Sequence, residues 1–296
     1  MSENSRFAAD FFKICSHGFG CLAEEAQKLI RETIATSQTE EGLFADRHNS
    51  GDLYYTFFGL LLTAVTNAKI NLKACRKAIE LIDVETLDFV HRCMFLRIDN
   101  LIKLLEIPTF LRHEAAKYLS PKADRQAREK IQNLSSMPDD TFPQSDPNSP
   151  YSRFLLSTLY ADFGMQIADF NLNSYRLKSG LYSNLKHDSE YNVNATASAM
   201  FVISETERLE TGNTLRNLQQ DDGSFKAIEK APGGDVLSTG TAFFALNKFG
   251  IAPKTSVKSF LRLCFREDGL FAATPDDPQG DLEYTTYALL ALGGSV

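Results

Sequence analysis

The sequence predicts an all-α protein in which two kinds of helix alternate around a ring. Three observations lead to this prediction. A short segment with a glycine turn and a helix start recurs along the chain, segments that are apolar nearly all round alternate with amphipathic ones, and strand signals are nearly absent. With 296 residues, of which 43% are hydrophobic, the chain can bury a large core, and we expect a single domain over residues 1–296.

The recurring segment is a Gly-x-Phe/Tyr turn followed, after ten to twelve residues, by an acidic residue that opens an apolar helix. Gly180, Gly223 and Gly269 lie 43 and 46 residues apart, and Gly42 precedes Gly180 by 138 residues, three times 46. A fixed period of this length is typical of repeat proteins. Six units of about 46 residues therefore fit, two of them without the turn. The copies pair Gly42-Leu43-Phe44 with Asp52, Gly180-Leu181-Tyr182 with Glu190, Gly223-Ser224-Phe225 with Asp235, and Gly269-Leu270-Phe271 with Asp281.

The helices can be placed in order from their apolar spacing. Residues 22–34 predict the first outer helix, and residues 52–65 predict a buried inner helix. Residues 71–106 predict two helices with Asp83 as a cap between them, and the Pro/Asp-rich stretch 135–150 predicts an irregular loop. Further inner helices are expected within 195–203, 242–246 and 287–292, and an outer helix at 257–265. This alternation describes an α/α toroid, an α/α6 barrel of inner and outer helices.

Composition excludes several classes of function. The net charge of −7 argues against a nucleic-acid partner. The five cysteines are scattered and odd in number, which favours reduced thiols in the cytoplasm over a disulfide framework. The first ten residues do not resemble a secretory signal, and the longest apolar run, 57–65, is too short for a transmembrane segment. We therefore expect a soluble cytoplasmic protein.

Three stretches carry a resemblance to a known superfamily: Gln220-Asp221-Asp222-Gly223-Ser224-Phe225, Gly234-Asp235, and Asp281-Leu282-Glu283-Tyr284-Thr285-Thr286-Tyr287-Ala288-Leu289. They are similar to the terpenoid cyclase/protein prenyltransferase α/α-toroid superfamily, especially bacterial prenyltransferase-β-like and squalene–hopene-cyclase-like chains. The resemblance is strong over about 170–296, clear at 42–65 and weak between. It implies the toroid fold and an isoprenoid substrate; activity must be argued from the site.

The sequence departs from the zinc-binding motif of the superfamily, and we therefore expect no zinc. Zinc-dependent prenyltransferases take Asp-x-Cys from one repeat and a His from a later one, to hold a thiolate. Here Leu237 follows Asp235 in the Cys position, and Tyr284 stands in the His position. Asp88-x-x-His91 echoes the His motif in another repeat, with an ordinary helical histidine as the simpler interpretation. We predict no cofactor, with Mg²⁺ only if a diphosphate is bound.

Class II terpene cyclases carry D-x-D-D-T at the same place, and their central Asp protonates an alkene or epoxide. Asp281-Leu282-Glu283-Tyr284-Thr285 keeps an acid at the centre, so Glu283 is the candidate general acid. Asp281, Asp235 and Asp52 are further catalytic candidates at the inner-helix starts, where we also expect Glu190, all at one end of the barrel. The alternative is helix capping, because an acid at a helix start satisfies free N–H groups.

Aromatic side chains on the inner helices are candidates to line a central cavity and to hold an isoprenoid chain or a carbocation. Packing in the core is the alternative for each of them. Two cations on a predicted helix could meet a diphosphate, or could lie on the surface. These substrate-binding candidates are Tyr54, Tyr55, Phe58, Tyr191, Tyr284, Tyr287, Arg92 and Arg97.

The leading hypothesis is a terpenoid cyclase/prenyltransferase-like enzyme that cyclises an isoprenoid by acid initiation without metal. The first alternative is a non-catalytic toroid that binds an isoprenoid or other apolar small molecule, or serves as an interaction scaffold. The second is a β-like subunit with a protein partner, or a homodimer. A carbohydrate substrate is not excluded, but it requires paired carboxylates at glycosidase spacing.

Overall fold

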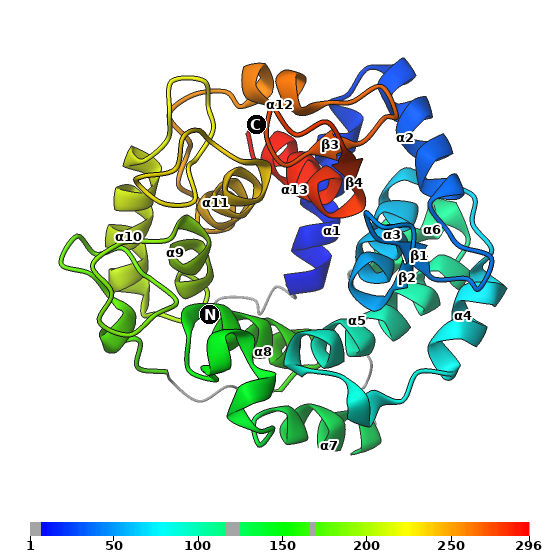
Figure 1. Ribbon diagram of the computed structural model, residues 1–296, viewed down its shortest axis with the longest axis horizontal. Helices are drawn as coiled ribbons and strands as arrows, with labels where there is room; N and C mark the ends of the chain where they lie inside the picture. The colour runs from blue at the N-terminus through cyan, green and yellow to red at the C-terminus, as the bar shows by residue number, and fades with distance from the viewer. Residues whose placement is uncertain (1–6, 117–124, 166–169, 296) are drawn as a thin grey trace.

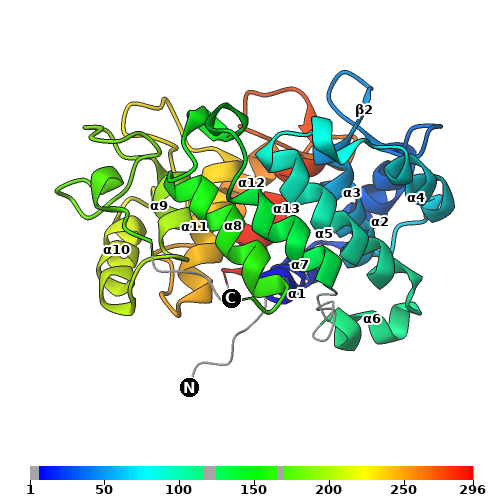
Figure 2. The ribbon, with the colours of Figure 1, turned by 90° about the horizontal axis from the view of Figure 1, so that it is seen from below.

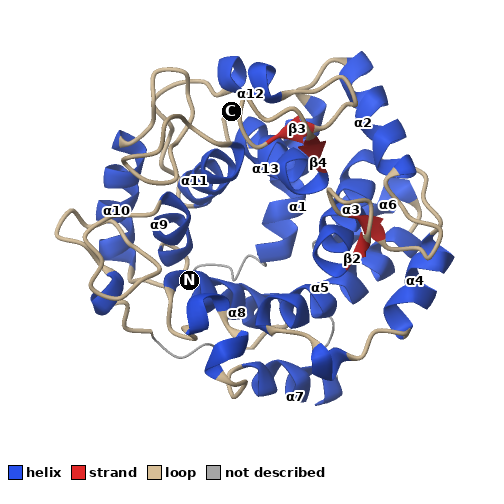
Figure 3. Ribbon diagram, in the orientation of Figure 1, coloured by secondary structure: helices blue, strands red, loops and turns tan. Residues whose placement is uncertain are grey.

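The computed structural model describes residues 7–116, 125–165 and 170–295. This part of the chain holds thirteen α-helices and two hairpins of two-residue antiparallel strands, so the all-α prediction is confirmed (Figure 3). The helices are α1 Phe7–Gly20, α2 Glu24–Thr36, α3 Leu53–Thr66, α4 Leu72–Glu80, α5 Phe89–Glu106, α6 Thr109–Ala116, α7 Arg125–Leu134, α8 Pro150–Asp162, α9 Val193–Ala199, α10 Glu205–Asn217, α11 Val236–Lys248, α12 Lys258–Cys264 and α13 Leu282–Gly293. The strands are β1 Phe44–Ala45, β2 Gly51–Asp52, β3 Phe271–Ala272 and β4 Gly280–Asp281.

Six helices surround the centre of the molecule, and each packs against the next. Their order is α3, α5, α8, α9, α11 and α13, and α13 packs back onto α3 (Figure 1). On the outside lie α2, α4, α7, α10 and α12. The irregular stretch predicted at 135–150 separates α7 from α8 and contains two 3₁₀ turns. Among the described helices, none combines the length and the apolar character that crossing a bilayer requires.

Each Gly-x-Phe/Tyr turn has a specific backbone requirement. Its glycine has a positive φ, from +84° to +104°, a backbone conformation that residues with a side chain rarely adopt. A Cβ on Gly42 would also lie 2.5 Å from the carbonyl oxygen of Ala74, so the turn sits directly against α4. The aromatic residue of the turn then donates its backbone N–H to a threonine hydroxyl in the first turn of the inner helix. These bonds are Phe44 to Thr56, Tyr182 to Thr196, Phe225 to Thr239 and Phe271 to Thr285, at 2.9–3.0 Å.

Every inner helix begins at a residue whose side-chain oxygen accepts the backbone N–H three residues later, a standard N-cap. The prediction that Glu190 opens an inner helix is wrong, because Asn192 is the cap of α9. Asp83 caps the 3₁₀ turn Val84–Thr86 and not α5. The six caps are Asp52, Asp88, Ser149, Asn192, Asp235 and Asp281.

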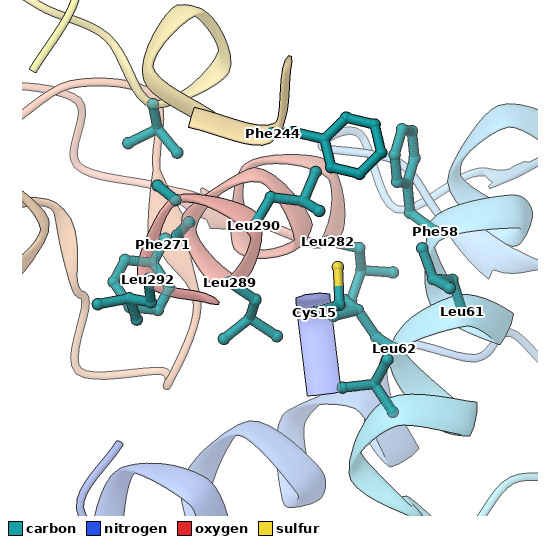
Figure 4. Packing of buried hydrophobic residues seen from close by; sticks show 14 of the residues in the cluster. Cys15, Phe58, Leu61, Leu62, Phe244, Phe271, Leu282, Leu289, Leu290 and Leu292 are labelled. Atoms are coloured by element: carbon teal, nitrogen blue, oxygen red, sulfur yellow. The ribbon is translucent and has the colours of Figure 1, made fainter. Parts of the chain in front are cut away.

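Helix α1 was not predicted, because residues 7–20 carry no copy of the recurring segment. It packs against α13 and α3 and, seen from the side, lies toward the lower face of the ring (Figure 2). Its approach to α13 requires glycine: a Cβ on Gly18 would lie 1.9 Å from the carbonyl oxygen of Leu289. Figure 4 shows Cys15 of α1 among leucines of α13 and α3, including Leu289 and Leu62. Helix α1 is therefore a fixed part of the core.

Contacts between the first and last copies of the segment close the ring. Arg47, in the turn between β1 and β2, donates to Asp281 at 2.7 Å and to Asp277 at 2.9 Å. The turn glycine Gly269 packs against Leu29 of α2, where a Cβ would lie 2.6 Å from the leucine side chain. Residues more than 200 positions apart are thus held together at one seam.

Candidate functional site

A cavity of about 280 Å³ lies inside the ring. Ten of the described residues that line it are aromatic. Among the described lining residues, Glu283 is the one acidic residue and Arg97 the one basic residue. Small-molecule sites are commonly mostly apolar with a few polar groups, at roughly 300–1,000 Å³. The cavity therefore has the composition of a small-molecule site, with a volume just below that range.

The lining follows one register on all six inner helices. Side chains two, six and nine positions after the cap fall on one helical face, and this face contributes most of the wall. Two positions after the cap stand Tyr54, Tyr151, Asn194, Leu237 and Glu283. Six positions after it stand Phe58, Met94, Leu155, Ser198, Thr241 and Tyr287. Nine positions after it stand Arg97, Phe244 and Leu290, together with Phe201, which lies just beyond the end of α9.

Glu283 is the one carboxyl side chain among the described lining residues. Its Oε1 accepts a hydrogen bond of 2.7 Å from the hydroxyl of Tyr54, on the neighbouring helix α3. Burial raises the pKa of Glu283 from 4.5 to about 7; the Tyr54 hydrogen bond lowers it and nearby Asp281 raises it. Because this pKa lies near neutrality, Glu283 can hold or release a proton at physiological pH.

Asp281 occupies the ring seam beside this cavity. It caps α13 through the Tyr284 amide, pairs with Arg47 and accepts a 3.4 Å bond from the Tyr55 hydroxyl. Burial raises the pKa of Asp281, against the lowering effect of the Tyr284 amide and Arg47. Arg47 also lies over the Tyr284 ring, 5.2 Å from its centroid. Asp281, Tyr55 and Tyr284 are therefore seam residues, and none of them is among the cavity-lining residues.

The other predicted acids are helix caps. Asp52 accepts the Tyr55 amide at 2.8 Å, and Asp235 accepts the Ser238 amide at 2.7 Å. Burial raises the pKa of Asp235. Neither carboxylate lines the cavity. The capping alternative thus accounts for both positions.

Of the two predicted cations, one lines the cavity and one does not. Arg97 reaches the cavity, forms an ion pair of 3.5 Å with Asp162 and donates to Thr158 at 2.7 Å. The prediction that Arg92 contacts a ligand there is corrected, because its guanidinium turns back to the carbonyl of Leu87 and to Glu85. Tyr191 is half-buried and also lies outside the lining.

Several lining residues were not predicted from the sequence. Phe7 and Phe11 come from α1, and Tyr151 and Phe154 from α8, which has no recurring segment. The amides were missed as well, although the register after each cap could have found Asn194. Figure 1 shows α9 facing α3 across the ring, so Asn194 and Tyr54 occupy the same register on opposite walls. These unpredicted amides are Asn184, Asn192 and Asn194.

No protein-family model matches the chain, and the search of curated proteins finds no match. Function must therefore be argued from the site. Within residues 7–116, 125–165 and 170–295, no three His, Cys, Asp or Glu side chains converge as metal ligands would. Leu237 lines the cavity and Tyr284 lies at the seam, so the two positions compared with zinc ligands carry no metal-binding group.

Proposed function

We propose that the ring of helices is an α/α toroid of the terpenoid cyclase and prenyltransferase-like kind, and that it acts as an enzyme on an isoprenoid in its cavity. Glu283 carries this proposal. It is a carboxyl group held by Tyr54, with a pKa raised to about 7, in a wall that is otherwise mostly apolar and rich in aromatic side chains. The recurring segments and the closed order of the inner helices support the toroid assignment. The five free cysteines support a cytoplasmic setting.

The reaction is an acid-initiated cyclisation. Glu283 transfers its proton to an epoxide oxygen or alkene carbon of the substrate, and the electron-deficient carbon is attacked by the π electrons of a second alkene to form a carbon–carbon bond. Return of a proton from the product cation to the carboxylate closes a net isomerisation. Tyr54 donates to the carboxylate that forms, and the aromatic faces of Phe58 and Tyr287 can stabilise the cation.

A ligand-binding protein without catalysis is the second candidate. The pKa of Glu283 favours it, because an acid with a pKa of about 7 is weak for protonating an unactivated alkene. An epoxide oxygen is much more basic and remains a suitable proton acceptor. A scaffold or β-like subunit role, with a protein partner or a second copy, belongs to this same non-catalytic class.

The test is incubation with C10 and C15 isoprenoids, each as an alkene and as the terminal epoxide, with products analysed by mass spectrometry. We expect cyclic isomers from the wild-type protein and none from Glu283→Gln, with binding of the epoxide retained. The control is Asp52→Asn, which keeps a cap oxygen for α3 outside the cavity. Binding without any product in the wild-type protein would establish the ligand-binding candidate.

A further inference from the structure

The wall formed by α9 and the segment before it differs from the rest of the cavity. Asn184, Asn192 and Asn194 line it with amide side chains. At the equivalent register, α3 has Tyr54 and α11 has Leu237. Three amides would weaken the binding of a plain hydrocarbon, because each polar group covered by an apolar ligand loses its hydrogen bonds to water.

The carbonyl oxygens of all three amides are already engaged. Asn184 Oδ1 accepts the Tyr151 amide at 3.1 Å, and Asn192 Oδ1 accepts the Ala195 amide at 2.9 Å. Asn194 Oδ1 accepts the Thr241 hydroxyl at 2.6 Å. The backbone N–H groups fix the orientation of the Asn184 and Asn192 amides, because only an amide oxygen can accept from them. The orientation of the Asn194 amide is assigned from the Thr241 hydroxyl, which can also accept. The groups that remain are the NH₂ donors.

The NH₂ groups have few acceptors within the protein. Asn194 Nδ2 has a long contact of 3.4 Å to the Ser238 hydroxyl, and no described residue accepts from Asn184 Nδ2 or Asn192 Nδ2. The three residues that carry these donors come from two neighbouring segments and line one cavity. A ligand that satisfies them must present an oxygen acceptor.

The charges around the cavity exclude a strongly anionic acceptor. Arg97, the cation among the described lining residues, is committed to Asp162 and Thr158. Arg47 is committed to Asp281 and Asp277 at the seam. A diphosphate in the cavity would therefore lack the cationic partners that phosphate recognition uses.

We propose that Asn184, Asn192 and Asn194 form a hydrogen-bond-donating subsite for the neutral oxygen of an isoprenoid alcohol or carbonyl compound. The apolar body of the ligand then lies over the aromatic wall, toward Glu283. The inference rests on the proposed function in one respect, since it places the ligand in the same cavity. The subsite adds that the substrate carries a neutral oxygen, which lies at the asparagines and away from Glu283.

Replacement of asparagine by aspartate removes the NH₂ donor and puts a carboxyl group of nearly the same shape in its place. Each substitution keeps the accepting oxygen, and so the bonds from Tyr151, Ala195 and Thr241, but turns the donor into an acceptor. The matched control is Asn71→Asp, the same change at the cap of the outer helix α4, where the side chain accepts the Ala74 amide. Thermal unfolding of each variant checks that the fold is retained.

The ligands are farnesol, the hydrocarbon β-farnesene and farnesyl diphosphate, titrated by calorimetry. We expect farnesol to bind about tenfold more tightly than β-farnesene, the equivalent of one good hydrogen bond. Asn194→Asp should remove this preference, measured as the ratio of the two affinities so that an effect of the added carboxyl group on both ligands cancels, while Asn71→Asp should retain it. Farnesyl diphosphate should bind no more tightly than farnesol.

Equal affinities for farnesol and β-farnesene, with no effect of Asn194→Asp, would overturn the subsite and leave an apolar binding cavity intact. Tighter binding of farnesyl diphosphate would overturn the neutral ligand class. If no ligand binds the wild-type protein, the proposed function fails together with the subsite. A cyclic product formed without a preference for farnesol would support the enzyme and contradict the subsite, so the two failures remain distinguishable.

Discussion

The hydroxyl of Tyr54 donates a 2.7 Å hydrogen bond to Oε1 of Glu283, joining the first turns of the first and last inner helices across 229 residues of sequence. This bond stabilises the carboxylate and opposes the effect of burial, which raises the pKa of Glu283 to about 7. The pKa of Glu283 therefore depends both on its own burial on α13 and on Tyr54 of the neighbouring helix α3.

Removal of the Tyr54 hydroxyl should move the pKa of Glu283 upward. We expect Tyr54→Phe to raise it above about 7, because the variant loses the hydrogen bond that favours the charged form while the burial remains. Carbon-detected NMR titration of Glu283 measures the shift. Tyr55→Phe is the control, since its hydroxyl contacts Asp281. An unchanged or lower pKa in Tyr54→Phe would contradict the assigned role.

The raised pKa also predicts a pH-dependent stability. The folded protein favours protonated Glu283, so its contribution is fully present below about pH 4.5 and is lost as pH rises through about 7. Glu283→Gln has a neutral side chain at every pH, so its stability does not fall in this way as pH rises. A shift from 4.5 to about 7, at about 1.4 kcal/mol per unit, amounts to up to about 3 kcal/mol.

Urea unfolding at pH 5 and pH 8 measures this difference. We expect the unfolding free energy of Glu283→Gln, relative to wild type, to increase between the two values. Glu40→Gln, on the exposed surface, controls for the loss of one carboxyl group. A relative stability that is the same at both pH values would show that Glu283 is not protonated preferentially in the folded state.

The recurring segment made much of the fold predictable. A positive φ selects glycine at the turn, and the helix start needs an oxygen three residues before a free N–H. The spacing of ten residues at Gly42 led to Glu190 in the second copy. The three later copies use twelve residues, which places the cap at Asn192.

The candidate site was less predictable than the fold. Glu283 and Tyr54 could be found, because both follow a recognisable cap by two positions. The contribution of Phe7 could not, since it depends on how α1 packs beneath the ring and not on a local pattern. Arg97 and Arg92 lie on one helix, and only the rotation of α5 decides which of them faces the cavity.

The ring seam predicts a stability contribution from Arg47. Arg47→Met leaves the carboxylate of Asp281, whose side chain is 6% exposed, without its cation. We expect a loss of about 2–3 kcal/mol in unfolding free energy. Arg76→Met, which breaks an exposed pair with Glu106, should cost no more than about 0.5 kcal/mol. Equal losses of unfolding free energy for Arg47→Met and Arg76→Met in chemical denaturation would show that the seam ion pair stabilises the protein no more than an exposed one.

The residues at the compared zinc positions predict that the purified protein holds no stoichiometric zinc. A leucine at 237 and a tyrosine at 284 supply no thiolate or imidazole. Elemental analysis by mass spectrometry tests this directly. One zinc per chain that disappears in Asp235→Ala would show the prediction to be wrong.

The threonine of each recurring segment should contribute more to stability than a threonine elsewhere on the same helix. On α3, Thr56 and Thr63 are both buried. Thr56 accepts the buried N–H of Phe44, whereas Thr63 only donates back to the carbonyl of Gly59 in its own helix. Thr56→Val should cost about 1–3 kcal/mol, because the N–H of Phe44 loses its acceptor inside the protein.

Thr63→Val is the matched control. It leaves no backbone donor without an acceptor, and a hydroxyl that bonds back to its own helix gives little stability. We therefore expect this change to be small in urea unfolding of the two variants side by side. If Thr56→Val were as mild as Thr63→Val, the hydrogen bond between turn and helix could not be the reason that a threonine follows the cap by four positions in every recurring segment. Capping alone would then have to set the register that places Tyr54 and Glu283 in the cavity wall.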